Sequence, residues 1–178
     1  AAGSEESGGV RALDRALDRL TAGFDHQLVT HLVELEPGLF VLELFHGPTA
    51  AFKDLAMQLV AALTDEALSA SGERLTILTA TSGDTGAAAV RAFAGAKSVD
   101  LVVLHPLDRV SPIQRKQMTT VQADNVLNLA VRGDFDDCQR LVKSLLAEPA
   151  LRERGRLSSV NSINWARLAG QIPYYVSA

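Results

Sequence analysis

Segments with strand-like and helix-like patterns alternate through the middle of the chain. The apolar, β-rich segments are residues 75–80, 99–104 and 126–131, and the helical segments that follow them are residues 84–94, 112–121 and 134–146. This alternation is typical of βαβ units, in which helices connect parallel strands. The stretch LVVL is apolar without interruption, as in strands covered on both faces. We therefore expect an α/β fold, a three-layer sandwich whose mainly parallel sheet is flanked by helices.

The rest of the chain has helical and turn patterns of its own. Residues 11–20 and 52–71 place leucine and alanine at helical spacing. Between these two helices, Pro37-Gly38 separates two extended apolar stretches, which predicts a hairpin. After the alternating region, residues 148–156 are polar and predict a surface loop, and a final helix is expected over residues 164–178.

The composition limits the partners that the chain can bind. The net charge is −4 and aromatic residues make up 5% of the 178 residues, so we expect no nucleic-acid partner. No apolar run reaches the roughly 18 residues of a membrane span, and the acidic amino terminus differs from a signal peptide. The single cysteine, Cys138, excludes an internal disulfide. These features predict no membrane partner and a cytoplasmic location.

The first candidate site is the segment FHGPTAAFKD at residues 45–54. A strand is expected to end at Phe45, and Lys53 falls in the first turn of the next helix. The helix dipole there disfavours the charged form of a lysine, and the neutral amine is the form that attacks a carbonyl carbon. The competing interpretation is a solvated lysine paired with Asp54.

The second candidate site is the segment TATSGDTGAAAV at residues 79–90, which joins a strand to an alanine-rich helix. Its two glycines let a ligand approach the backbone, and Thr81, Ser82 and Thr85 add hydroxyl groups. Asp84 would repel an anion, so a hydroxyl or a cationic nitrogen suits it better as a partner. The competing interpretation is an ordinary helix start capped by Ser82 or Asp84.

The third candidate site is the segment NSINWAR at residues 161–167. A helix that starts near Ser162 would let Asn161, Ser162 and Arg167 converge, and arginine suits bidentate binding of phosphate or carboxylate. The competing interpretation is a helix cap followed by a surface arginine. Trp165 is more typical of a core residue.

No metal site is expected. The four histidines are His26, His31, His46 and His105. They lie far apart in the sequence, without the spacing of known metal-binding motifs. Cys138 lies among acidic residues on a predicted helix, where a half-buried packing role is expected.

Together these segments resemble the threonine synthase family, pyridoxal-phosphate enzymes of the same fold type as tryptophan synthase β and O-acetylserine sulfhydrylase. The resemblance is carried by LELFHGPTAAFKD, TILTATSGDTGAAAV, SPIQRKQMTTVQADNV, GDFDDCQ and VNSINWARLAGQIPYY, in this order. It extends weakly back to LTAGFDHQLVTHLVEL, where the family usually has proline and this chain has Gln27 and His31. The resemblance implies the small domain and part of the large domain of a tryptophan synthase β-like fold.

The resemblance also implies roles for the residues of the first two segments. Lys53 would hold the cofactor, pyridoxal 5′-phosphate, and act as the catalytic base and acid. Asp84 would bind the cofactor. The amino-acid end of the substrate would bind at Thr81, Ser82 and Thr85.

The third segment would bind the substrate's phosphate through Asn161, Ser162 and Arg167. The implied reaction is that of a lyase acting on a phosphate ester, which converts O-phospho-L-homoserine and water to L-threonine and phosphate. Two alternatives remain open. The chain could belong to a related pyridoxal-phosphate lyase that acts on another phosphorylated amino acid, or it could be a non-catalytic α/β module that binds a small anion.

The implied organisation divides the chain into four parts. These are residues 1–9, disordered or vector-derived; residues 10–52, a helix and strands of the large domain; residues 53–150, the small α/β domain; and residues 151–178, a loop and helix that lead back to the large domain. The family's glycine-rich loop for the cofactor phosphate would lie beyond Ala178. We therefore expect a partial chain that lacks the remainder of the large domain and is inactive by itself.

Overall fold

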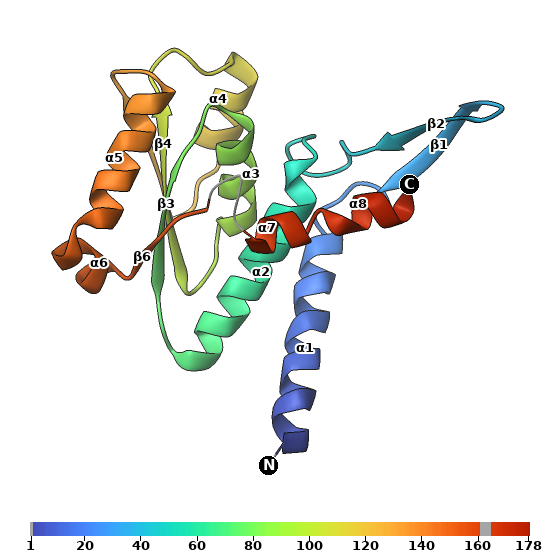
Figure 1. The fold of residues 1–178 in the computed structure, drawn as a ribbon, viewed down its shortest axis with the longest axis horizontal. Helices are drawn as coiled ribbons and strands as arrows, with labels where there is room; N and C mark the ends of the chain where they lie inside the picture. Colours follow the sequence, from blue (N-terminus) through green and yellow to red (C-terminus); the bar gives the residue numbers. More distant parts are fainter. Residues whose placement is uncertain (1, 161–164) are drawn as a thin grey trace.

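A parallel sheet forms the centre of the computed structural model, which describes residues 2–160 and 165–178 (Figure 1). The strands of this sheet are β3 (Leu75–Ala80), β4 (Val99–Pro106), β5 (Val126–Val131) and β6 (Leu157–Ser158). Their order within the described residues is β5-β4-β3-β6, and every pairing is parallel. The register places Ile77 opposite Leu101 and Leu101 opposite Val126. The predicted parallel sheet is confirmed.

Helices cover both faces of this sheet. One face carries α2 (Lys53–Ser71), α3 (Asp84–Phe93) and α4 (Pro112–Thr119), and the other carries α5 (Phe135–Ala147). Each face of the sheet has its own apolar core, and successive side chains of β3 point to opposite faces. Ile77 therefore packs in the same cluster as Phe93, and Leu78 packs in the same cluster as Cys138. Cys138 is completely buried rather than half-buried, and this burial raises the pKa of its thiol. The expected three-layer sandwich is confirmed.

The amino-terminal segments pack beside α2. Helix α1 (Ala2–Thr21) runs along α2, and Arg15 and Arg19 form ion pairs with Glu66 and Asp65 at 2.7 and 3.3 Å. The helix begins before the expected residue 11, so residues 2–9, expected to be disordered or vector-derived, continue it. Strands β1 (His31–Glu36) and β2 (Leu39–Glu43) form the predicted antiparallel hairpin, which projects from the body of the molecule (Figure 1).

The carboxyl-terminal part differs from the expectation in two ways. Residues 148–156, predicted as a loop, contain helix α6 (Pro149–Gly155), because proline favours the first position of a helix. The predicted final helix is instead divided into α7 (Trp165–Ala169) and α8 (Ile172–Ser177). The break falls at Gly170, which packs so closely on α2 that a Cβ there would lie 3.0 Å from Cα of Ala56.

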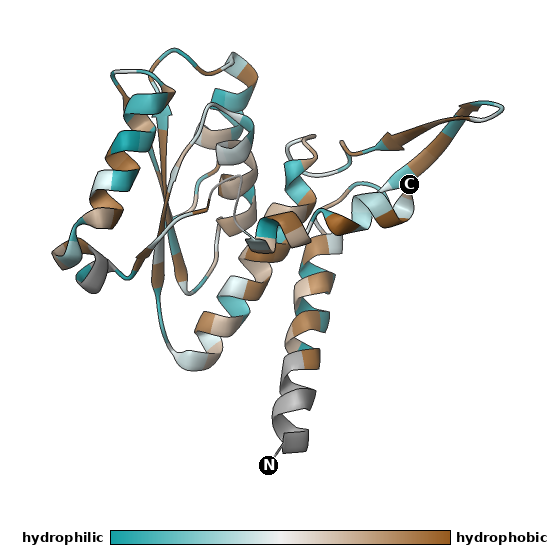
Figure 2. Ribbon diagram, viewed as in Figure 1, coloured by the Kyte–Doolittle hydropathy of each residue, from teal (hydrophilic) through white to brown (hydrophobic). Residues whose placement is uncertain are grey.

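Large apolar side chains remain exposed on the hairpin and on the last two helices. Much of the hairpin ribbon has the brown of hydrophobic residues in Figure 2. Phe40 on β2 is 52% exposed and Tyr175 on α8 is 80% exposed. Trp165, expected in the core, is 81% exposed. It lies two residues from the buried Arg167, so the two side chains take opposite sides of α7. Among the described residues, no helix is long and apolar enough to cross a membrane.

Candidate active site

Lys53 lies where the first two candidate segments meet. It is the first residue of α2, and its Nζ atom is 3.0 Å from Oδ2 of Asp84, just after the carboxyl end of β3. Only 16% of the Lys53 side chain is exposed, and Nζ lies 4.5 Å from the centre of the Phe52 ring. In open α/β sheets, ligands bind outside the carboxyl ends of the strands. The ion pair therefore places an amine and a carboxylate where a ligand is expected.

Asp54 has a separate, structural role, so the interpretation that pairs it with Lys53 is wrong. Asp54 is 1% exposed. Its Oδ2 accepts a hydrogen bond from the Thr49 amide at 2.8 Å, and its Oδ1 accepts one from the Thr49 hydroxyl at 2.6 Å. Burial raises the pKa of Asp54, and the bonds from Thr49 oppose that rise. Asp54 thus holds the loop that leads to Lys53.

The Asp84 carboxylate is held from its other side by α4. Nε2 of Gln114 donates to Oδ1 of Asp84, while the hydroxyl of Ser111 donates to Oε1 of Gln114 at 2.8 Å. The hydrogen bond from Lys53, followed by the one from Gln114, lowers the pKa of Asp84. Asp84 therefore faces a cationic nitrogen, as its charge suggested. Sequence reasoning missed Ser111 and Gln114, although Ser-Pro at the start of a helix could have indicated that α4 begins beside this loop.

Thr81 organises the turn between β3 and α3 from inside. Its Oγ1 accepts hydrogen bonds from the amides of Gly83 and Gly86 at 3.0 and 2.8 Å, and the residue is 1% exposed. Gly83 is the N-cap residue, with φ +149°, so the interpretation that Ser82 or Asp84 caps the helix is wrong, and the hydroxyl of Thr81 accepts from the helix amide of Gly86 instead. Ser82 is exposed and Thr85 is half-buried. Ser82 and Thr85 are therefore less enclosed than Thr81, whose oxygen accepts the two hydrogen bonds of the turn.

The turn leaves no room for a side chain at position 86. A Cβ there would lie 2.4 Å from Cγ2 of Thr81 and 2.7 Å from Sδ of Met118. We expect Gly86→Ala to lower the free energy of unfolding by about 2 kcal/mol, measured by urea denaturation, because both neighbours are buried. Gly23→Ala is the matched control, since its Cβ would meet only ordinary contacts from 3.4 Å outward. Equal stability of the two variants would contradict this account of the turn.

The lowered pKa of Asp84 gives a second prediction. A carboxyl whose pKa is lower in the folded chain stabilises the fold above its unfolded pKa, and this contribution is lost as pH falls through the folded pKa. We expect the stability difference between the wild type and Asp84→Asn to be constant above about pH 5. It should shrink as pH falls below the ordinary value of 3.8. Urea midpoints across this range measure the difference, and a pH-independent difference would contradict the prediction.

The third candidate segment is described only in part, because Asn161 and Ser162 lie outside the described residues. Arg167 on α7 is 2% exposed, and burial lowers the pKa of its guanidinium. The hydroxyl of Tyr174 on α8 donates to the backbone carbonyl of Phe52, the residue before Lys53. Burial raises the pKa of Tyr174. The negative charge of Asp54 raises it further, and the positive charge of Arg167 lowers it. Tyr174, which the sequence did not single out, therefore joins α8 to the turn that carries the lysine.

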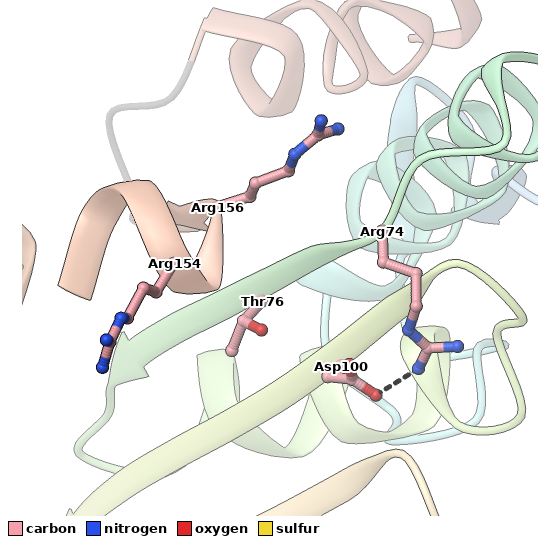
Figure 3. Close-up of a pocket in the computed structure, with 5 residues that line it drawn as sticks. All are labelled: Arg74, Thr76, Asp100, Arg154 and Arg156. Carbon is pink, nitrogen blue, oxygen red and sulfur yellow. Dashed lines mark hydrogen bonds and ion pairs between the residues drawn. The ribbon is translucent and has the colours of Figure 1, made fainter. Parts of the chain in front are cut away.

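A surface pocket of about 340 Å³ lies at the opposite edge of the sheet (Figure 3). Its lining residues are Arg74, Thr76, Asp100, Arg154 and Arg156. They come from the amino ends of β3 and β4 and from α6 and the residue after it. Arg74 and Arg156 form ion pairs with acidic residues at 2.6 and 2.7 Å. This pocket is therefore separate from the Lys53 site.

Three of the four histidines meet beside the hairpin. His31 lies opposite Glu43 in the β1–β2 register, and Nδ1 of His31 is 3.4 Å from Oε2 of Glu43. Nε2 of His46 is 2.7 Å from the same oxygen. The ring of His26 stacks on His31 with centroids 4.4 Å apart. The expectation that the histidines lie far apart is therefore wrong for these three. Strand pairing sets His31 opposite Glu43, and the rings of His26 and His46 lie beside it.

Comparison with known proteins finds similarity to enzymes that depend on pyridoxal phosphate. The family model described as "Pyridoxal-phosphate dependent enzyme" matches residues 24–176. The chain is 48% identical to a threonine synthase of Pseudomonas aeruginosa over 164 residues, which are 92% of this chain and 35% of that protein. It is 45% identical to a threonine synthase of Schizosaccharomyces pombe over 172 residues, covering 92% of this chain and 34% of that protein.

A solved structure agrees with these similarities. The crystal structure of threonine synthase from Brucella melitensis with bound pyridoxal phosphate matches with a TM-score of 0.88 and 48% identity. The match covers 93% of this chain and 36% of that one. This chain thus spans about a third of the length of the relatives it matches.

Proposed function

This chain belongs to the family of pyridoxal-phosphate dependent enzymes, and on that premise we propose that it is part of a threonine synthase. The reaction would convert O-phospho-L-homoserine and water to L-threonine and phosphate, a step of threonine biosynthesis. The observation that carries the proposal is the half-enclosed Lys53 amine, paired with Asp84 at 3.0 Å beside the SGDTG turn. Two relatives at 48% and 45% identity are named threonine synthases, which supports threonine as the product.

The residues around Lys53 fit pyridoxal phosphate. The group carries an aldehyde that a lysine amine can hold, and Lys53 presents such an amine at the ligand-binding edge of the sheet. Asp84 is fixed by Gln114, so it can orient Lys53 or a polar group of the cofactor. When bound, pyridoxal phosphate supplies an electron sink for charge that develops next to the substrate's amino group.

The chain's own residues would bind the substrate and move its protons. Lys53 would remove one proton from Cα and one from Cβ through Nζ, and would return protons to Cγ and to Cα. The Asp84 ion pair holds Nζ in position. The hydroxyls of Ser82, which is exposed, and Thr85, which is half-buried, would donate to the substrate carboxylate. Arg167, together with Asn161 and Ser162, would bind the phosphate, which leaves Cγ with its bonding electrons. A proton then added at Cγ forms the methyl group, after which water adds its hydroxyl at Cβ and gives its proton to the released phosphate.

Two further features bear on the whole protein. The exposed apolar side chains of the hairpin and of α7 and α8 would pack against the rest of a large domain, since the relatives are about three times as long as this chain. We place the protein in the cytoplasm, in keeping with its single, free and buried Cys138.

The test is the reaction itself, carried out with the full-length protein. We expect O-phospho-L-homoserine to give L-threonine and phosphate in equal amounts, and O-phosphoserine to give far less product. Turnover of another phosphorylated amino acid without threonine formation would overturn the substrate assignment. Binding of inorganic phosphate by a protein that takes up no pyridoxal phosphate would overturn the enzyme assignment altogether.

A further inference from the structure

The histidine cluster beside the hairpin forms a compact set of metal-ligand atoms. One nitrogen each from His31 and His46 and one oxygen from Glu43 all lie within 4.8 Å of one another. Their side chains are 34%, 13% and 23% exposed, so the set is partly enclosed and still reachable from solvent. Two imidazoles and one carboxylate are ligands that zinc accepts, with a fourth position left open.

The spacing of these atoms suits a tetrahedral ion. Zinc bonds nitrogen and oxygen at about 2.0–2.2 Å, which sets neighbouring ligand atoms about 3.3 Å apart. The pair His31 Nδ1 and Glu43 Oε2 already lies at 3.4 Å. The pair His46 Nε2 and Glu43 Oε2 lies at 2.7 Å, a hydrogen-bond length, so a proton occupies the place that a metal would take. An opening of about 0.6 Å would bring this pair to the spacing that zinc requires.

Asp25 supplies an independent sign of a built site. Its Oδ1 lies 2.9 Å from Nδ1 of His46, the nitrogen that faces away from Glu43. The backbone fixes this pair as well, because the Asp25 amide donates to the His46 carbonyl at 3.0 Å. A carboxylate behind the ligating histidine orients the ring and makes its other nitrogen a stronger ligand. The cluster thus has both the ligands and the support of a metal centre.

We propose that His31, Glu43 and His46 bind a zinc ion, or another divalent transition ion that prefers imidazole, at a site separate from Lys53. The ion would join both strands of the hairpin to the segment that continues through Gly47 and Thr49 to Lys53. The hairpin is an isolated two-stranded sheet, which is marginally stable without further contacts. Zinc would therefore stabilise the hairpin and fix where the lysine-bearing loop begins.

The experiment is a zinc titration of the full-length protein by calorimetry after metal removal, together with thermal unfolding. We expect the wild type to bind one more equivalent of Zn²⁺ than His31→Gln or Glu43→Gln at matched concentrations. Each of these variants should weaken the site by about 100-fold or more, and Asp25→Asn should weaken it by about 10- to 100-fold. The rise in Tm with Zn²⁺ should be smaller in all three variants.

Glu36→Gln is the matched control, because Glu36 is an exposed acid on the same hairpin at the end away from the cluster. It should leave the zinc affinity unchanged. Circular dichroism establishes that each variant is folded. His31 and Glu43 lie on the hairpin with partly exposed side chains, so replacing them should not disturb the core. Equal stoichiometry and affinity in the wild type, His31→Gln and Glu43→Gln would overturn the proposal.

Discussion

Lys53→Ala in the full-length protein is expected to abolish threonine formation, with a loss of about 10³-fold or more in kcat. The same variant should lose the visible absorbance band of the bound cofactor, because Nζ of Lys53 is the amine proposed to hold the group. The physical reason is that the site depends on one amine, which belongs to a side chain only 16% exposed and is held by Asp84 at 3.0 Å. Spectra and turnover measured on the same preparations test both effects.

Two further variants separate the chemistry of Lys53 from its charge. Lys53→Arg keeps a positive charge beside Asp84, yet a guanidinium remains protonated and cannot serve as the amine. It should therefore be as inactive as Lys53→Ala while retaining more stability. Lys116→Ala on the exposed surface of α4 is the matched control and should keep both the band and the activity. A band that survives Lys53→Ala would remove Lys53 from its proposed role.

The largest effect on stability is expected from Asp54→Leu, which should lower the free energy of unfolding of the chain by about 3 kcal/mol. Asp54 is 1% exposed and Thr49 is 7% exposed, so the amide and hydroxyl of Thr49 would lose their acceptor without gaining water. Asp54→Asn should cost about 1 kcal/mol, because its amide oxygen still accepts from the Thr49 amide and the Thr49 hydroxyl can rotate to accept. Urea denaturation measures both values.

The control for this pair is Asp124→Asn, which changes an exposed carboxylate in a turn and should leave stability unchanged to within about 0.5 kcal/mol. We therefore expect the free energy of unfolding to be lowest for Asp54→Leu, higher for Asp54→Asn and highest for the control. If Asp54→Leu proved as stable as the wild type, Asp54 would not organise the loop before Lys53. The same loop delivers the lysine, so Asp54→Leu should also weaken the absorbance of the bound cofactor.

Much of the site could be predicted because its residues lie in segments with their own local patterns. Lys53 and Asp84 were identified from the turns that follow apolar strands, and the structure joins them at 3.0 Å. The partners that hold them could not be predicted in the same way. Gln114 and Tyr174 lie 30 and 122 residues from the atoms they contact, so no periodicity or spacing connects them.

The positions of the histidines could not be predicted from the sequence either. Sequence spacing argued against a metal site, because helical motifs place ligands three or four residues apart. Here the hairpin register brings His31 against Glu43, and Asp25 and His46, which flank the hairpin in the sequence, pair with each other. Strand pairing thus brings together residues whose sequence separation carries no signal.

The alternation of apolar strands with helices determined the layered parallel sheet from the sequence alone, since burial on both faces requires continuous apolar strands. It also placed the SGDTG turn at the edge where ligands bind. Lys53 follows a strand of the separate hairpin, so only the tertiary structure brings it to that edge. The tertiary structure alone decided that Lys53 pairs with Asp84 rather than Asp54, that Trp165 is exposed and that three histidines meet. These outcomes depend on which helix face packs inward and which distant strands pair, and local sequence patterns do not encode those choices.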